Sequence, residues 1–304
     1  MDLSIVICTY NRAYFLRLGL EAIISQLNLV TDFSIELLVV DNNSSDTTDS
    51  LVSEFKERYQ NLSILYFLEQ QQGLSFSRNR SVKEANGEFI AFLDDDAVVN
   101  KNWLPSLIDA IGNTKAHVYG GPIYPNFEIP CPEWIDETYF IRSFNNGDGY
   151  LSSLASKSGF SGGNMCFKKD IFDSIGLFNT SLGMNGNTLG LGEETDLFDR
   201  LFHSTYKTKL YNIDLMSISH FEGRAKLDRL YLKERIHLSG LQFSHRFRSQ
   251  YKVGGTLLVF MKILKQFLSS LVFLIQRPFY PSSKFKFLKC IWLIKGLWKG
   301  VFIS

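Results

Sequence analysis

The apolar residues of the first 120 positions follow two alternating patterns. Short, nearly continuous apolar runs are typical of buried strands, and stretches with apolar residues three or four positions apart are typical of helices. The runs cover residues 4–8, 35–40, 64–67, 89–93 and 117–119. Helical spacing lies between them, at 16–27, 51–55 and 103–111. This alternation predicts an α/β fold with a doubly wound, mostly parallel, Rossmann-like sheet covered by helices on both faces.

Polar segments follow several of these strands, where a sheet of this kind binds its ligands. Arg78, in one of them, is a cation that suits a diphosphate. Each segment also has a structural interpretation, such as a turn for Asn11, a helix cap for Asp46 or a solvated helix position for Arg78. Together they predict one ligand site at one edge of the sheet. The segments are 9–12, 41–46, 73–80 and 94–96.

Asp94, Asp95 and Asp96 end the run 89–93. Three adjacent carboxylates repel one another, so a buried strand that ends in them must offer them to a cation or to polar ligand groups. Carboxylate oxygens suit Mg2+ or Mn2+, which bind through one or two carboxylates and substrate phosphates. A solvated acidic loop is the alternative.

Residues 123–158 show no regular pattern and contain a turn cluster at 145–149. A loop of this length in a compact domain is usually functional or disordered, so we expect a mobile cover over the site. Trp134 and Tyr139 would then stack on a sugar or form a wall of the site. A local packing role for both is the alternative.

A second polar cluster begins at Gly163 and Asn164, where glycine allows close backbone approach. The Gly-rich stretch 183–192 precedes a helical pattern that begins with Glu193 and Glu194. A helix N-terminus stabilises carboxylates by its dipole, which would explain both residues structurally. The functional interpretation is that one of them is a general base.

In this order and spacing, the motifs make residues 3–222 resemble a family 2 glycosyltransferase with the GT-A fold. The fold expected is therefore a GT-A sheet domain over 1–222, followed by a C-terminal helical region over 223–304. The motifs are Val6-Ile7-Cys8-Thr9-Tyr10-Asn11-Arg12, Val39 to Asp46, Arg78-Asn79, Asp94-Asp95-Asp96, Gly163-Asn164-Met165 and Glu193-Glu194.

The resemblance implies a role for each matched residue. Asp96 would coordinate the metal, and His220 stands where some relatives place a further metal ligand, although a structural histidine is the alternative. Glu194 stands where many relatives have an aspartate as catalytic base. The residues implied in nucleotide-sugar binding are Thr9, Asn11, Arg12, Asp41, Arg78, Asp94 and Asp95. Those implied in the donor or acceptor sugar pocket are Gly163, Asn164, Glu193 and Trp134.

The activity implied is a metal-dependent, inverting transfer of a sugar from a nucleotide-sugar, expected to be a UDP-sugar, to a glycan or lipid-linked saccharide. Surface or exopolysaccharide biosynthesis is the expected setting. A non-catalytic nucleotide- or glycan-binding scaffold with the same fold is the alternative. A sugar-1-phosphate nucleotidyltransferase is disfavoured, because no Gly-rich, basic triphosphate loop follows the first strand.

The net charge of +1 hides an uneven distribution. Residues 251–304 contain nine Lys or Arg and no Asp or Glu, which is typical of a segment that meets an anionic surface. The four cysteines are far apart and lack a metal-binding spacing, so we expect reduced thiols in a cytosolic setting. The chain begins with neither a charged leader nor an apolar secretory segment, which favours a cytoplasmic protein.

Residues 254–275 are apolar apart from Lys262, Lys265 and a few neutral polar residues. Each lysine near a membrane midplane would cost about 2.5–3.5 kcal/mol, which argues against a simple span. The two lysines share a helical stripe with Gln266 and Ser269, as expected for a helix lying in the membrane interface. We therefore expect peripheral contact of residues 253–304 with the inner face of the cell membrane. A basic cap on the protein itself or an oligomer contact is the alternative, and the apolar content argues against nucleic acid.

Overall fold

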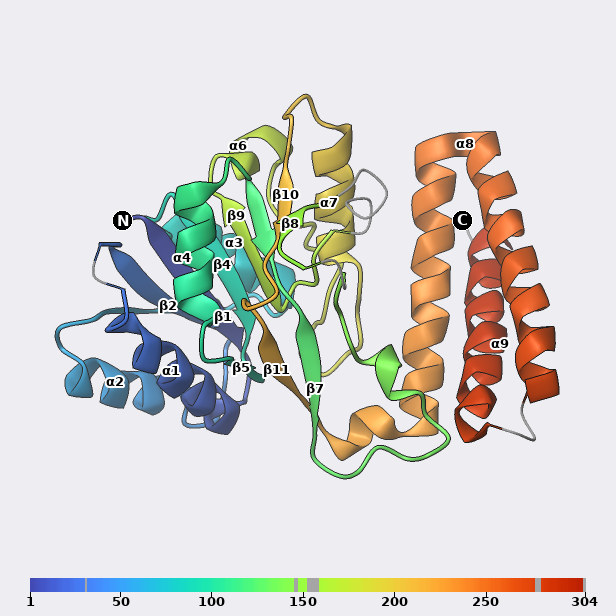
Figure 1. Cartoon of the computed structure of the whole chain (residues 1–304), viewed down its shortest axis with the longest axis horizontal. Coiled ribbons are helices and arrows are strands. Elements are labelled where there is room, and N and C mark those ends of the chain that lie inside the picture. Colours follow the sequence, from blue (N-terminus) through green and yellow to red (C-terminus); the bar gives the residue numbers. More distant parts are fainter. Residues whose placement is uncertain (31, 145–146, 152–158, 277–279, 303–304) are drawn as a thin grey trace. The chain divides into compact units, whose positions relative to one another are not determined.

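The computed structural model describes residues 1–30, 32–144, 147–151, 159–276 and 280–302, and only the backbone of 249–253 (Figure 1). The chain divides into two compact units. The sheet unit comprises residues 1–125, 141–188 and 193–221, and the helical unit comprises 126–140, 189–192 and 222–304.

Strands and helices alternate through the sheet unit, as the apolar pattern predicts. Its strands are β1 (Leu3–Thr9), β2 (Ile35–Asp41), β3 (Ser63–Leu68), β4 (Phe89–Asp94), β5 (Ala97–Val99), β6 (Val118–Gly120), β7 (Ile123–Phe127), β8 (Gly149–Tyr150), β9 (Asn164–Lys168), β10 (Leu210–Asn212) and β11 (Ile218–Glu222), of which β7 and β11 run on into the helical unit. Its helices are α1 (Ala13–Leu27), α2 (Thr48–Arg58), α3 (Leu74–Glu84), α4 (Trp103–Asn113), α6 (Ile171–Ile175) and α7 (Glu193–His203).

Among the described residues, eight strands form one sheet in the order β3-β2-β1-β4-β9-β6-β10-β8. The first four strands of this order are parallel, and β9 runs antiparallel between β4 and β6. The carboxyl ends of β1, β2 and β4 therefore lie together, with Cys8 in register with both Val40 and Asp94. This arrangement confirms the predicted doubly wound, mostly parallel sheet.

Helices cover both faces of this sheet (Figure 1). On one face, Leu16, Leu20 and Ile23 of α1 pack in a core that includes Trp103 of α4 and residues of α2. On the other face, Phe167 and residues of α3, α6 and α7 form a second core. Each fully buried large apolar side chain contributes about 1.5–3 kcal/mol to stability. The two cores fix the edge of the sheet at which the polar loops gather.

The structure corrects two expectations about local structure. Residues 73–80, predicted only as a polar segment, lie mostly in α3 (Leu74–Glu84), whose inward face carries Ser75, Ser77, Arg78 and Ser81 beside one apolar residue, Val82. Because most of these residues are polar, apolar periodicity does not reveal the helix. The segment 123–158, expected to be irregular, contains β7, β8 and a short 3-10 helix, Glu137–Tyr139. Residues 145–146 and 152–158 of the expected cover lie outside the described part of the chain.

A second, three-stranded sheet has the order β5-β11-β7. In this sheet β11 runs antiparallel to β5, and His220 is in register with Ala97, the residue that follows the three aspartates. The backbone N–H of Phe221 donates to the carbonyl of Asp96 at 2.9 Å. This pairing carries His220 to the end of β4 at Asp94, 126 positions earlier in the chain.

The helical unit contains a second 3-10 helix, Arg224–Leu227, followed by α8 (Arg229–Gln276) and α9 (Pro281–Phe302). One contact within α8 shows that the helix is not straight. The Lys262 ammonium lies 3.3 Å from the centre of the Phe243 ring. In a straight helix, residues 19 positions apart would be about 28 Å apart. A Cβ on Gly255 would also collide with the carbonyl of Phe247. α8 therefore folds back on itself (Figure 1) into a first arm, residues 229–248, and a second arm, residues 254–276.

Small residues allow α9 to pack closely on the first arm. A Cβ on Gly240 would lie 2.5 Å from the carbonyl of Leu293, and one on Gly296 would meet the carbonyl of His237. The Ser244 hydroxyl donates to the carbonyl of Leu297 at 2.7 Å. The two arms and α9 together form a compact helical bundle.

Trp134 and Tyr139 belong to the helical unit. Their rings contact the ring of Phe285 edge-on, with centroids 6.0 and 5.2 Å away. Phe285 on α9 is completely buried. These contacts favour the packing alternative for both aromatic residues.

The predicted polar stripe of the second arm is mostly half-buried. Lys262, Gln266 and Ser269 are half-buried, and Lys265 alone of the predicted stripe is exposed. Most of the arm's large apolar side chains are exposed instead. Within the helical unit, the predicted polar stripe is therefore less exposed than the apolar side chains of the same arm. The side chain of residue 253, and residues 277–279 and 303–304 of the predicted membrane-contacting segment, lie outside the described residues.

Candidate functional site

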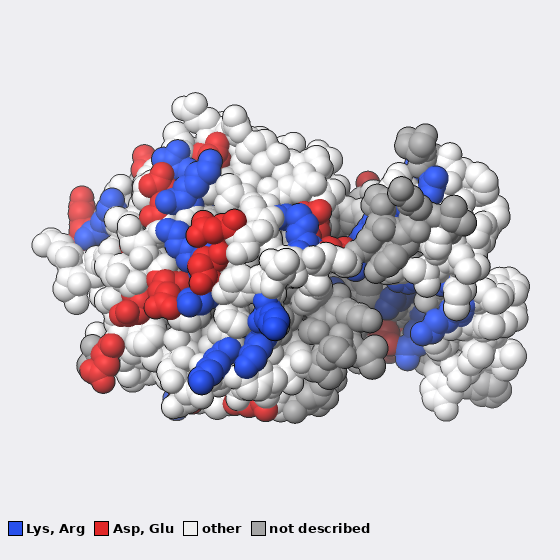
Figure 2. Space-filling model, turned by 90° about the horizontal axis from the view of Figure 1, so that it is seen from above, with Lys and Arg blue, Asp and Glu red and all other residues white. Residues whose placement is uncertain are grey.

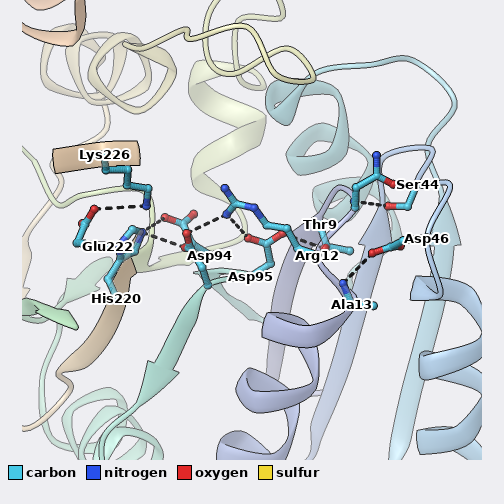
Figure 3. A network of polar contacts seen from close by, with 12 residues as sticks. Thr9, Arg12, Ala13, Ser44, Asp46, Asp94, Asp95, His220, Glu222 and Lys226 are labelled. Atoms are coloured by element: carbon cyan, nitrogen blue, oxygen red, sulfur yellow. Dashed lines mark hydrogen bonds and ion pairs between the residues drawn. The ribbon is translucent and has the colours of Figure 1, made fainter. Parts of the chain in front are cut away.

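An acidic cluster with one histidine lies where β4 ends (Figure 3). Nε2 of His220 lies 3.0 Å from Oδ1 of Asp96 and 3.7 Å from Oδ2 of Asp94. One ligand atom of each residue lies within 4.8 Å of the other two. Two carboxylate oxygens and an imidazole nitrogen in this proximity suit a divalent cation such as Mn2+ or Mg2+. The structure thus brings together the two residues predicted as metal ligands and adds Asp94 to them.

Asp95 is engaged by the loop that follows β1. Its carboxylate accepts a hydrogen bond from the Thr9 hydroxyl at 2.9 Å and one from Nη1 of Arg12 at 2.9 Å. The same Arg12 nitrogen lies 2.8 Å from Oδ2 of Asp96. Burial and the charge of Asp96 raise the pKa of Asp95, and Arg12 offsets part of this rise. Thr9 and Arg12 are therefore adjacent to the acidic cluster, as predicted for the ligand edge.

Arg78 is buried and joins two carboxylates. Its Nη1 lies 3.0 Å from Oε1 of Glu193, and its Nη2 lies 3.4 Å from Oδ1 of Asp94. The guanidinium also lies over the ring of Phe178, 5.5 Å from the ring centre. A solvated helix cation, the alternative interpretation of Arg78, is therefore excluded by its burial. The guanidinium instead connects α3, the end of β4 and the start of α7.

Two adjacent glycines make room for this connection. A Cβ on Gly162 would lie 2.6 Å from Nη2 of Arg78, and a Cβ on Gly163 would collide with the carboxylate of Asp94. Gly163 was expected in the sugar pocket because it allows close approach, and the group that approaches it is Asp94. Any larger residue at 163 would displace a carboxylate of the cluster.

Glu193 and Glu194 begin α7, as the sequence pattern predicts. Glu193 is buried, and burial and the charge of Glu194 raise its pKa, while Arg78 lowers it. Glu194 is half-exposed. The two neighbours therefore differ in environment, because Glu193 is buried against Arg78 and Glu194 is partly exposed.

The loops after β1 and β2 are held to each other. The backbone N–H of Asn11 donates to the Ser44 hydroxyl at 2.8 Å, and the side-chain oxygen of Asn11 accepts from the backbone N–H of Ser45 at 2.7 Å. Asn11 has a positive φ of 54°, a backbone conformation that asparagine adopts more readily than most residues. The carboxylate of Asp46 accepts from the backbone N–H groups of Ala13 and Thr48. Asp46 thus satisfies the first backbone N–H of both α1 and α2, a structural role, although the N-cap positions are Arg12 and Thr47.

Asp41 is buried at the end of β2. Its carboxylate accepts from the backbone N–H of Ser44 at 2.9 Å and from the hydroxyl of Tyr66 at 2.8 Å. Each carboxylate oxygen can accept a further hydrogen bond, so these contacts orient the group without exhausting it. Tyr66 was not recognised from the sequence, because nothing in the pattern of β3 distinguishes it from a packing residue.

Asn164 is completely buried. Its side-chain oxygen accepts from Nε1 of Trp103 at 2.8 Å, and its amide nitrogen donates to the carbonyl of Met216 at 2.7 Å. This placement favours a role in fixing β9 over the predicted contact with a sugar. Trp134, also predicted in the sugar pocket, lies in the helical unit against Phe285.

Comparison with known proteins identifies the family. Residues 4–176, more than half of the chain, match the family model described as glycosyl transferase family 2. The chain belongs to glycosyl transferase family 2. It is therefore a glycosyltransferase, and the resemblance drawn from its motifs is confirmed.

Curated relatives of this family 2 chain take part in glycan assembly. The chain is 25% identical over 235 residues to the glucosyl-dolichyl phosphate glucuronosyltransferase of Haloferax volcanii, an alignment that covers 76% of this chain and 73% of the relative. It is 28% identical over 199 residues to the succinoglycan biosynthesis protein ExoM of Rhizobium meliloti, covering 65% of this chain and 60% of that protein.

A solved structure shares the fold of this family 2 enzyme. The mannosyltransferase PcManGT from Pyrobaculum calidifontis, in complex with GDP-Man and Mn2+, superposes with a TM-score of 0.63 at 14% identity. The match covers 99% of this chain and 87% of that one. At this identity the likeness establishes the GT-A fold.

Proposed function

We propose that this glycosyltransferase transfers a sugar from a nucleotide-sugar donor to a glycan or lipid-linked saccharide, with inversion at the anomeric carbon. The observation that carries the proposal is the cluster of Asp94, Asp96 and His220 at the carboxyl end of β4. In this class of sheet, that edge is where ligands bind.

A divalent cation would be held by Asp94, Asp96 and His220. The donor set fits, because one oxygen of each carboxylate and the imidazole Nε2 already lie within 4.8 Å of one another. The guanidinium groups of Arg12 and Arg78 also lie beside Asp96 and Asp94 respectively, which offsets part of the repulsion between these carboxylates. When bound, Mn2+ or Mg2+ would stabilise the negative charge that develops on the diphosphate leaving group.

Glu194 is our candidate for the general base. It would accept the proton of the acceptor hydroxyl as that oxygen attacks the anomeric carbon. It follows Glu193, which shares a guanidinium with Asp94 of the metal cluster. Glu194 is therefore tied by its neighbour to the place where the donor would be cleaved. One displacement with a base of this kind would invert the anomeric configuration.

The remaining predicted residues would hold the donor. Asp41 has acceptor capacity left for a base or ribose, and Thr9, Asn11 and Arg12 lie on or beside the same loop edge. Arg12 has a side chain that is 42% exposed and can still meet a phosphate. Arg78 would act indirectly by orienting Asp94, because its guanidinium is already engaged.

We extend the proposal to the setting of the reaction. Residues 254–276 form one helix that is long and apolar enough to cross a membrane, and the Haloferax relative is named for a dolichyl phosphate substrate. The ExoM relative is named for succinoglycan. We propose a surface or exopolysaccharide pathway, with the protein at the cytoplasmic face of the cell membrane.

A thermal-shift panel tests the proposed donor and metal. UDP, GDP, dTDP and CMP are each added with Mn2+ and with a chelator, to the wild type and to Asp96→Ala. A ligand at 100 times its Kd stabilises the folded state by about 2.7 kcal/mol. We expect a shift for UDP that is lost with chelator and in Asp96→Ala. A shift for GDP alone would reassign the donor, and no shift with any nucleotide would favour the non-catalytic scaffold.

A further inference from the structure

The second arm of α8 exposes a continuous apolar stripe. Leu257, Met261, Leu264, Leu268 and Ile275 follow one another at intervals of three, four or seven residues, and each is at least 55% exposed. The stripe is flanked by further exposed apolar side chains of the same arm. These are Leu258, Phe260, Phe267, Leu271, Val272 and Leu274.

This stripe differs from the surface of an ordinary soluble helix. The most apolar 18-residue window of the segment Gly254–Gln276 has a mean hydropathy of 1.9, yet only 11% of this window is buried. A core helix of a soluble protein with this composition would be mostly buried. Where Figure 1 draws the second arm, most of the described surface in Figure 2 is white, the colour of residues other than Lys, Arg, Asp and Glu. Monomeric soluble proteins rarely expose this many large apolar side chains side by side, so the stripe marks an interaction site.

Two polar residues of the arm, Lys262 and Ser270, are directed away from the stripe, whereas Lys265 is exposed. The ammonium of Lys262 lies 3.3 Å from the centre of the Phe243 ring on the first arm, a cation–π contact within the bundle. The Ser270 hydroxyl is buried and donates to the carbonyl of Phe267 at 2.7 Å. In the sequence Lys262 counts against a membrane span, and the fold places its ammonium on the protein side of the arm.

Charge distinguishes between the possible occupants of the stripe. Residues 251–304 contain no Asp or Glu, and Lys265, Lys284, Lys295 and Lys299 are exposed on the second arm and α9. A second copy of the same segment would bring like charges together. An anionic lipid surface would offer hydrocarbon to the stripe and phosphates to the lysines.

The charges of α9 and of the first arm argue against an orientation in which the bundle spans the membrane. α9 carries five lysines within 22 residues, and the first arm begins with Arg229, Lys233, Glu234 and Arg235. A spanning bundle would bring several of these into hydrocarbon at about 2.5–3.5 kcal/mol each on insertion scales. If the second arm lies parallel to the bilayer, its whole apolar stripe is buried in lipid, and the first arm and α9 stay on the aqueous side.

We propose that the second arm of α8 lies in the interface of an anionic bilayer, with the stripe centred on Leu264 and Leu268 entering the acyl region. This inference rests on the proposed function in one respect: if the acceptor is lipid-linked, the bilayer contact brings the enzyme to the surface that holds the acceptor. The contact itself requires no catalytic residue. It keeps the interfacial helix expected from the sequence and specifies that the exposed apolar stripe is the face that enters the bilayer.

Vesicle flotation of the full-length protein tests this contact. Vesicles of phosphatidylcholine with phosphatidylglycerol are compared with vesicles of phosphatidylcholine alone. The wild type should float with the anionic vesicles and stay bound at high salt. The double variant Leu264→Asp/Leu268→Asp should partition at least about tenfold less, because two charges would enter the acyl region. Leu230→Asp, at a first-arm position that is 72% exposed, is the matched control and should bind like the wild type.

Three outcomes would overturn the proposal. They are a wild type that does not float, a double variant that floats as well as Leu230→Asp, and a wild-type dimer that the double variant converts to a monomer without a change in flotation. Circular dichroism and the nucleotide-dependent thermal shift of each variant show whether the fold and the donor site are intact. A failed donor site with intact flotation would count against the proposed function alone.

Discussion

Arg78 and Glu193 form a buried ion pair, with Nη1 3.0 Å from Oε1, across 115 positions of the chain. The pair joins α3 to the first residue of α7, and the other guanidinium nitrogen reaches Asp94. The start of α7, which carries the candidate base, is thereby held in place relative to the acidic cluster. The guanidinium is the physical link between the two halves of the candidate site.

Replacing Arg78 should destabilise the protein strongly. Arg78→Ala leaves Glu193 and Asp94 without their shared cation, and breaking a buried pair costs about 3–5 kcal/mol. Arg78→Lys should also destabilise, because one ammonium cannot reproduce the two-sided guanidinium contact. Urea unfolding measures the loss. Arg17→Ala, which breaks the exposed pair with Glu54, is the control and should change the midpoint little. Equal effects at the two positions would contradict the linking role of Arg78.

Glu194→Gln should separate catalysis from binding. The amide keeps the shape of the side chain but cannot accept the acceptor proton, so turnover should fall by on the order of 100-fold or more. Nucleotide affinity should stay close to that of the wild type, because Glu194 does not contact the acidic cluster in the described contacts. Steady-state kinetics with the donor found in the thermal-shift panel, together with nucleotide titration, measures both. Unchanged turnover would remove Glu194 from the role of base.

His220→Ala should weaken metal binding. One of three proposed ligands is lost, and even residues that only support metal ligands usually contribute 10–100-fold to affinity, so we expect a decrease of at least about tenfold. Titration of Mn2+ followed by electron paramagnetic resonance reports free ion directly, without an activity assay. His203→Ala, at the end of α7, is the matched control. If both variants bind Mn2+ equally well, His220 is a structural residue.

Glu193 should make stability depend on pH. Burial and the charge of Glu194 raise its pKa above the unfolded value of about 4.3. The folded state therefore holds this proton more tightly than the unfolded state. Its contribution is fully present below pH about 4.3 and is lost as the pH rises through the folded pKa. Glu193→Gln cannot ionise and should show a flatter decline of unfolding free energy across that window. An unchanged pH profile in this variant would contradict the raised pKa.

Much of the fold was predictable because its signal is apolar. β1, β2 and β4 are continuous apolar runs, and α1 and α4 have helical spacing, so periodicity alone identifies them. α3 escaped because its buried face is Ser75, Ser77, Arg78 and Ser81, residues whose burial depends on partners far away in the sequence. The local pattern carries no information about those partners.

The candidate site was predictable to a similar extent. The strand ends indicated Asp94 and Asp96, and only the family resemblance suggested His220, which joins them through the pairing of β11 with β5. The link from Arg78 to Glu193 has no local signature. The reversal of α8 did have one, since the adjacent Gly254 and Gly255 interrupt a long helical run, and glycine pairs are a known cause of sharp helix bends.

The reversal of α8 also bears on how the protein can be prepared. The apolar C-terminal segment resembles a tail that could be deleted to obtain a soluble enzyme. Because the chain folds back, a truncation before the second arm would remove that arm and α9 together and uncover the close-packed surface around Gly240 and Ser244. Solubility is therefore better improved by polar substitutions along the exposed stripe, which leave the bundle intact, than by shortening the chain.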